Sequence, residues 1–214
     1  MAFFRAAGLR VRRMRPPAVL GIALALGALA CRSRPGPAPP VRIEIRTALG
    51  AITAELDPGR APATVANFLR YLDAGLFDGG RFHRAVTPEN QPRDAVRIEV
   101  VQGGPSPARA VQGFPPIALE RTSATGLRHL DGTLSMARSD PDTATSDFFV
   151  CIGDQPALDF GGPRNPDGQG FAAFGRVVAG MDVVRAIQAS PTRGQQLDPP
   201  VAIESIRRSP PPTR

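Results

Sequence analysis

Apolar and charged residues alternate strictly in a stretch that begins at residue 41. Val41, Ile43 and Ile45 each stand next to a charged residue, which is the period-two pattern of a strand with one buried face. Gly50 then indicates a turn, and a second apolar stretch over 52–56 follows it. We therefore expect a β-hairpin at the start of the folded part of the chain.

The apolar spacing changes to that of a helix after this hairpin. Pro62 suits the first turn of a helix, where its missing N–H is harmless. An apolar stripe with helical spacing follows at Val65, Phe68, Leu69 and Leu72. Gly75 ends this first helix, and a second helix is expected over 181–188.

Short apolar stretches separated by Gly and Pro fill the rest of the chain, and we find no internal repeat. These stretches predict strands at 82–86, 97–102, 132–137, 148–152, 171–177 and 201–206. Several short strands with two helices predict a mainly β domain, in which helices cover the ends of a β-barrel.

The first 30 residues have the pattern of an export signal. Arginines precede an uncharged apolar run over 18–30, and its 13 residues are fewer than the about 20 that span a membrane. The small or apolar residues before Cys31 resemble a bacterial lipoprotein cleavage site, which implies that Cys31 becomes the lipidated first residue of the mature chain. An ordinary secretory signal cleaved nearby is the alternative.

The lipoprotein resemblance leads to an expected location and domain plan. Because Arg32 rather than aspartate follows the cysteine, analogy with proteobacterial lipoproteins places the protein in the cell envelope, anchored by lipid in the outer membrane and facing the periplasm. Residues 31–40 carry the lipid and form a Pro-rich tether, 41–208 form the domain, and 209–214 form a disordered tail.

The positive charge of the chain lies outside the predicted domain. All 26 basic residues are arginine, and seven of them precede residue 41, where no acidic residue occurs. The remaining 19 arginines match 19 acidic residues, so the net charge of +7 belongs to the N-terminal segment. The basic composition is therefore no evidence for nucleic-acid binding, and we expect none.

Cysteine and histidine are too rare for a disulfide framework or a metal site. If Cys31 carries lipid, Cys151 is unpaired, and its apolar neighbours predict a buried, inert thiol. The two histidines have no cysteine or carboxylate at metal-ligand spacing, so we expect no metal ion. We interpret His83 as buried and hydrogen-bonded, and His129 as part of a loop.

Five motifs occur in a fixed order along the predicted domain. They are Phe82-His83-Arg84, Val101-Gln102-Gly103-Gly104, Gly132-Thr-Leu-Ser-Met-Ala-Arg138, Asp147-Phe-Phe-Val-Cys151 and Phe174-Gly175. This series resembles the cyclophilins, which are peptidyl-prolyl cis-trans isomerases. The resemblance covers roughly 41–208 and implies an eight-stranded β-barrel capped by two α-helices.

The resemblance also implies a site for proline. Rotation about an X–Pro bond has a barrier of about 18–20 kcal/mol, and lowering it requires an apolar pocket and a donor that favours the twisted amide. The resemblance makes Arg84 that catalytic donor. It assigns substrate binding to Val100, Gln102, Ala137, Arg138, Phe149, Leu158 and Phe171. We expect proline-containing polypeptides as partners, no cofactor and a monomer.

The sequence departs from the cyclophilin pattern around this site. Seventeen residues separate Arg84 from Gln102, which indicates an inserted loop near 87–96. Glu99 stands where the family has a pocket aromatic, although Ile98 could fill the gap. Other departures are Asp147 for a glutamine, Ala157 for a tryptophan and Phe171 for a histidine.

These departures leave three functions open. The first is an active isomerase that assists the folding of exported proteins. The second is a cyclophilin-like module that binds proline-containing segments with little or no catalysis, and the third is a structural lipoprotein.

Overall fold

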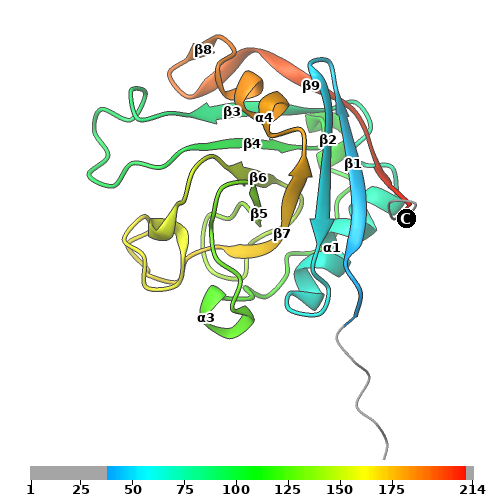
Figure 1. The fold of residues 1–214 in the computed structure, drawn as a ribbon, viewed down its shortest axis with the longest axis horizontal. Helices are drawn as coiled ribbons and strands as arrows, with labels where there is room; N and C mark the ends of the chain where they lie inside the picture. The colour runs from blue at the N-terminus through cyan, green and yellow to red at the C-terminus, as the bar shows by residue number, and fades with distance from the viewer. Residues whose placement is uncertain (1–37, 211–214) are drawn as a thin grey trace, which may run out of the picture. The chain divides into compact units, whose positions relative to one another are not determined.

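A computed structural model describes residues 38–210 of the chain (Figure 1). The expected export signal, Cys31 and most of the tether lie outside the described residues, as do the last four residues of the tail. Within 38–210 no helix combines the length and the apolar character that a membrane span requires.

Nine antiparallel strands within the described residues form one sheet. They are β1 (Val41–Thr47), β2 (Gly50–Leu56), β3 (Gly80–Val86), β4 (Val100–Gly104), β5 (Thr133–Met136), β6 (Phe148–Cys151), β7 (Ala172–Ala179), β8 (Thr192–Arg193) and β9 (Gln196–Arg208). The strand order is β1-β2-β7-β5-β6-β4-β3-β9-β8, and β1 also pairs with β9. Eight strands therefore close into a barrel, and β8 extends it as a hairpin with β9, which confirms the predicted fold class.

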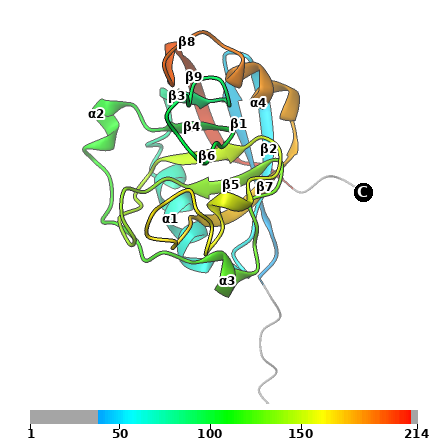
Figure 2. The same cartoon turned by 90° about the vertical axis from the view of Figure 1, so that its left-hand side faces the viewer.

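The two longer helices lie at opposite ends of this barrel (Figures 1 and 2). Helix α1 (Pro62–Asp73) begins at the predicted proline, and α4 (Met181–Gln188) covers the predicted range. The other helical segments are single turns: α2 (Pro107–Ala110), α3 (Thr122–Thr125) and the 3₁₀ turn η1 (Pro156–Leu158). The prediction that two helices cover the barrel is confirmed.

Aromatic side chains fill the space between α1 and the barrel. The Phe68 ring centroid lies 4.9 Å from that of Phe77, 5.4 Å from that of Phe148 and 5.3 Å from that of Phe174. Such tilted and edge-on pairs are favourable arrangements of aromatic rings. Because Phe148 points into this core, the next residue, Phe149, points to the opposite face of β6.

Two strands begin three or more residues away from the start that the apolar pattern predicts. Strand β4 begins at Val100 rather than at residue 97, because the backbone of Ile98 bonds the Gln91 side chain instead of a neighbouring strand. Strand β9 begins at Gln196 rather than at 201, because two prolines at 199–200 interrupt the apolar pattern that would predict its first half. This first half pairs with β3 next to Arg84.

Candidate active site

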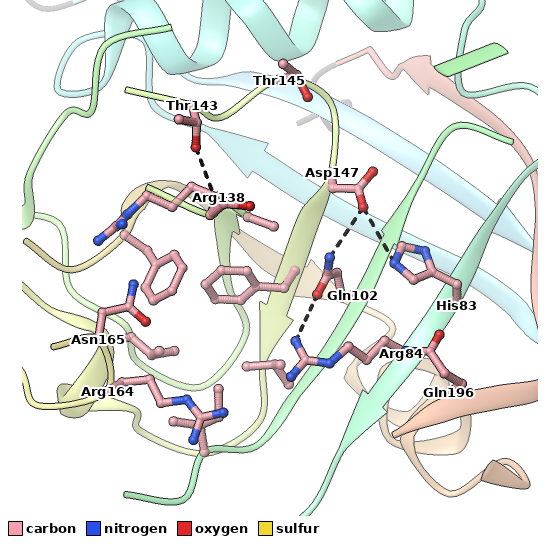
Figure 3. A pocket seen from close by; sticks show the side chains of 17 residues that line it. His83, Arg84, Gln102, Arg138, Thr143, Thr145, Asp147, Arg164, Asn165 and Gln196 are labelled. Carbon is pink, nitrogen blue, oxygen red and sulfur yellow. Dashed lines mark hydrogen bonds and ion pairs between the residues drawn. The ribbon is translucent and has the colours of Figure 1, made fainter. Parts of the chain in front are cut away.

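A pocket of about 560 Å³ opens on the outer face of the barrel over β3, β4 and β6 (Figure 3). All eight residues predicted for catalysis and substrate binding line it: Arg84, Val100, Gln102, Ala137, Arg138, Phe149, Leu158 and Phe171. Residues from six separate segments of the sequence therefore meet at one place.

The strand register explains how the central residues of the pocket come together. Arg84 on β3 pairs with Gln102 on β4, and Gln102 pairs with Phe149 on β6. Phe149 in turn pairs with Ser135 on β5. Directly paired residues project from the same face of a sheet, so these four side chains form one row across the barrel.

Neutral amide oxygens hold the guanidinium of Arg84. Its Nη1 donates to Gln102 Oε1 at 3.0 Å, and its Nε and Nη2 both donate to Gln195 Oε1, at 3.0 and 2.5 Å. Within residues 38–210 it forms no ion pair with a carboxylate. Burial lowers the pKa of Arg84 from its ordinary value, and the nearby positive charge of Arg164 adds to this effect.

Apolar side chains form the floor of the pocket. The rings of Phe149 and Phe171 meet edge to face, with centroids 5.4 Å apart and an angle of 88° between the planes. Ile98, Val100 and Leu158 pack beside them and are almost fully buried. This floor is large and apolar enough to take a proline ring.

Ile98 rather than Glu99 completes the apolar wall. Glu99 does not line the pocket, and its Oε2 accepts a hydrogen bond from Gln188 Nε2 at 3.2 Å. Ile98 and Val100 do line it, as alternate residues of an extended segment should. Glu99 therefore places no charge in the proline pocket.

A buried hydrogen-bonded chain supports Phe149 from behind. The His129 ring stacks on Phe149 with 6.0 Å between centroids, and its Nε2 lies 2.9 Å from Ser135 Oγ. His129 Nδ1 lies 2.7 Å from Asp159 Oδ1. Burial acts to raise the pKa of Asp159, but the hydrogen bonds from His129 outweigh it and hold that pKa below its ordinary value. Sequence reasoning placed His129 in a loop, as found, but missed its burial and this contact.

The Arg138 side chain fixes the loop that carries Phe171. It is almost fully buried, with bonds to Asp167 at 2.7 and 3.0 Å and to the Gly170 carbonyl at 2.8 Å. Its Cζ also lies 5.1 Å from the Phe171 ring centroid. Arg138 thus shapes the pocket while its guanidinium charge is neutralised by Asp167.

Asp147 and His83 form the opposite, polar edge of the pocket. Asp147 Oδ2 accepts a hydrogen bond from Gln102 Nε2 at 3.3 Å and lies 3.5 Å from His83 Nε2. The expectation that His83 is buried holds only in part, because its side chain is half-buried and stays 24% exposed at this edge. Burial lowers the pKa of His83, although the Asp147 charge acts in the opposite direction.

Several residues in or beside the pocket were not predicted, and two of them, Gln195 and Arg164, arrive on loops. Gln195 reaches Arg84 from the turn between β8 and β9, and its Nε2 donates to the Asn90 carbonyl at 3.4 Å. Arg164 reaches the pocket from the segment after η1 and bonds the Val96 carbonyl at 2.6 Å. The long spacing between Arg84 and Gln102 signalled an inserted loop but not its contacts.

The arrangement can bind an apolar ring and donate hydrogen bonds beside it. A guanidinium has five N–H donors, and three of those on Arg84 are used, which leaves two for a ligand. Among the described residues no group of three His, Cys, Asp or Glu side chains could hold a metal ion. The Cys151 thiol is buried beneath the pocket, and burial raises its pKa far above the ordinary value.

Comparison with known proteins agrees with this geometry. A family model described as "Cyclophilin type peptidyl-prolyl cis-trans isomerase/CLD" matches residues 41–208. The chain is 37% identical to peptidyl-prolyl cis-trans isomerase cyp18 of Streptomyces antibioticus, over 67% of this chain and 84% of that protein. It is 34% identical to peptidyl-prolyl cis-trans isomerase B of Escherichia coli, with the same coverage of both chains.

Solved structures share the fold. A cyclophilin-type peptidyl-prolyl cis-trans isomerase of Cryptosporidium parvum superposes with a TM-score of 0.65 at 21% identity, over 81% of this chain and 99% of that one. A structure of that protein in the presence of the dipeptide Ala-Pro gives a TM-score of 0.64, over 79% and 99% of the two chains.

Proposed function

Because the chain belongs to the cyclophilin-type peptidyl-prolyl cis-trans isomerases, we propose that it accelerates X–Pro isomerisation during the folding of exported proteins. The observation that carries the activity is the position of Arg84. Its charged donor stands beside an apolar floor made by Phe149, Leu158 and Phe171.

The chemistry requires no covalent step. As an X–Pro amide twists, it loses resonance and the prolyl nitrogen gains a lone pair that can accept a hydrogen bond. A guanidinium donor directed at that nitrogen binds the twisted amide more tightly than the planar one, which lowers the barrier. The apolar floor holds the proline ring in place during this rotation.

Proline-containing polypeptides are the proposed ligands. The pocket is open to solvent beside the row formed by Arg84, Gln102 and Phe149, so it can accept a loop within a longer chain. The C. parvum relative, whose structure was solved with Ala-Pro, supports this ligand class.

The proposed cellular role rests on the first 31 residues. A basic and apolar segment that precedes a cysteine supports export followed by lipid anchoring at Cys31. An isomerase held on the periplasmic face of the outer membrane by this anchor would meet chains that have just been exported.

One observation favours the second candidate, a proline-binding module with little catalysis. Gln195 engages both Nε and Nη2 of Arg84, so two of the three nitrogens already share one acceptor. A guanidinium fixed in this way could bind a substrate without following the amide as it twists.

An isomerisation assay separates these candidates. The full chain in mild detergent would be added to a peptide containing Ala-Pro, and NMR exchange spectroscopy would measure the cis-to-trans rate. Exchange that increases with protein concentration supports the isomerase. Chemical shift changes in the peptide without faster exchange would support the binding module. If the peptide shows no faster exchange and no shift changes, both candidates are contradicted.

A further inference from the structure

Two loops of the chain meet at one end of the pocket and bring a second arginine there. The first is the loop between β3 and β4, which contains Asp94 and Val96, and the second follows η1 and contains Arg164. Arg164 Nη1 donates to the Val96 carbonyl at 2.6 Å and lies 3.2 Å from Asp94 Oδ2. Arg164 is thereby held at the pocket that also contains Arg84 (Figure 3).

The charges around the pocket are unevenly balanced. Arg138 is neutralised by a bidentate bond to Asp167, and Asp147 lies at the opposite edge beside His83. Of the other two arginines that line the pocket, Arg84 pairs with no acid and Arg164 pairs with Asp94 alone, among residues 38–210.

Arg164 also has donors to spare. Both of its contacts use Nη1, and its Nε and Nη2 form no hydrogen bond within residues 38–210. The side chain of Arg164 is 16% exposed and that of its partner Asp94 is 39% exposed. Water therefore screens the attraction between them, and Asp94 offsets the charge of Arg164 only in part.

We propose that Arg164 forms a carboxylate-binding subsite beside the proline pocket, so that prolines flanked by an acidic group are the preferred substrates. A guanidinium presents its donors in a planar fork that matches a carboxylate. The acid can be a side chain next to the proline or the carboxylate of a chain that ends in proline. This inference rests on the proposed function, since it names the substrates of the same site.

The test compares three pairs of matched peptides. The first pair has Glu or Gln directly before proline and the second has Glu or Gln directly after it, all with blocked ends. The third pair ends in proline, with either a free carboxylate or an amidated C-terminus. NMR exchange would give kcat/KM for each peptide with the full chain. We expect the acidic member of at least one pair to be favoured about three- to tenfold at low salt, and less so at high salt.

Three variants separate the subsite from general charge effects. R164Q should abolish the acidic preference, so that the Glu and Gln members of each pair are turned over equally fast, while D94N should increase the preference by releasing Arg164 from its partner. Arg46→Gln removes the same charge from β1, outside the pocket, and should leave the preference unchanged.

The outcomes distinguish this inference from the proposed function. Equal rates for all acidic and neutral pairs would overturn the subsite while the isomerase stands. A preference that persists in R164Q and does not change in D94N would also overturn it. If no peptide is turned over, the isomerase fails, and dissociation constants for the same peptides, from NMR titration, still decide the subsite by the same comparison.

Discussion

Amides rather than carboxylates fix the charged donor of this site. A carboxylate beside Arg84 would neutralise the charge that has to act on the substrate, whereas the oxygens of Gln102 and Gln195 orient the guanidinium and leave its charge intact. A cation held in a half-buried site by neutral groups interacts more strongly with a ligand than one exposed to water.

Replacement of Arg84 by alanine should slow catalysis without unfolding the protein. A hydrogen bond from a charged donor is worth about 1.5–3 kcal/mol. If it forms mainly with the twisted amide, Arg84→Ala lowers kcat/KM about 10- to 150-fold, since each ~1.4 kcal/mol is a factor of ten. The melting temperature should stay close to that of the wild type, because the side chain lies outside the core clusters. An unchanged kcat/KM would remove Arg84 from the mechanism.

The pKa of His83 predicts how stability changes in mild acid. Burial lowers the pKa of His83 in the folded state, whereas in the unfolded chain this pKa is about 6.5. Below about pH 6.5 the unfolded chain therefore binds the proton more readily than the folded protein does. The free energy of unfolding should therefore fall as the pH drops below about 6.5. Asp159, whose folded pKa is also lowered, should add a further loss below about pH 4.

Urea unfolding at several pH values would check this behaviour. His83→Gln should flatten the curve between about pH 6.5 and 5 and leave the steeper loss at lower pH. An identical slope in the variant and the wild type between these values would show that His83 does not contribute.

At the scale of elements, the loop between β3 and β4 is an ordered part of the site. Gln91 in this loop is almost fully buried, and its Nε2 donates to the Thr87 carbonyl at 2.8 Å and to the Ile98 carbonyl at 2.7 Å. Its Oε1 accepts from the Ile98 N–H at 3.2 Å. One side chain thus joins the two ends of the loop and sets the position of Ile98 in the apolar wall.

Gln91→Leu should destabilise the protein and loosen this wall. It leaves buried backbone groups without partners, at a cost of about 1–3 kcal/mol. Urea unfolding measures the loss, and KM for a proline peptide should rise as Ile98 moves. Gln112→Leu, at an exposed glutamine, is the matched control and should change neither quantity by much. If both variants unfold at the same urea concentration, the loop is not held by Gln91.

The elements that the sequence predicts well are those whose pattern is local. Strand β1 and helix α1 follow from residue spacing alone, because each buries one face against the same core. The row of Arg84, Gln102 and Phe149 lies on three neighbouring strands, and the family motifs mark each of its members.

Residues that reach the pocket on loops could not be predicted in this way. Arg164 and Gln195 lie in segments without periodicity, and their positions depend on how distant parts of the chain pack. The start of β4 was predicted wrongly for the same reason. The side chain of Gln91, in the neighbouring loop, bonds the backbone of Ile98 in place of a strand partner.

For the molecule as a whole, the proposed anchor predicts a membrane-bound protein. Several acyl chains on Cys31 would hold the protein stably on a bilayer, whereas one chain binds only marginally. A fatty-acid analogue fed to cells should label the wild type, and Cys31→Ser should lose the label and leave the membrane fraction. Intact mass spectrometry that finds an unlipidated mature chain starting after residue 31 would identify a soluble exported protein instead.

The place of β9 in the barrel determines when the domain can be completed. It is the last strand along the chain, yet it lies between β1 and β3, which are made much earlier. Until a ribosome has synthesised β9, these two strands lack a neighbour, and the core lacks the buried Ile203 and Ile206. The barrel of a nascent chain therefore cannot close before β9 has been made. For a protein exported as we propose, this delay keeps the polypeptide unfolded, so that it can pass through a translocation channel. The barrel then closes only on the far side of the membrane.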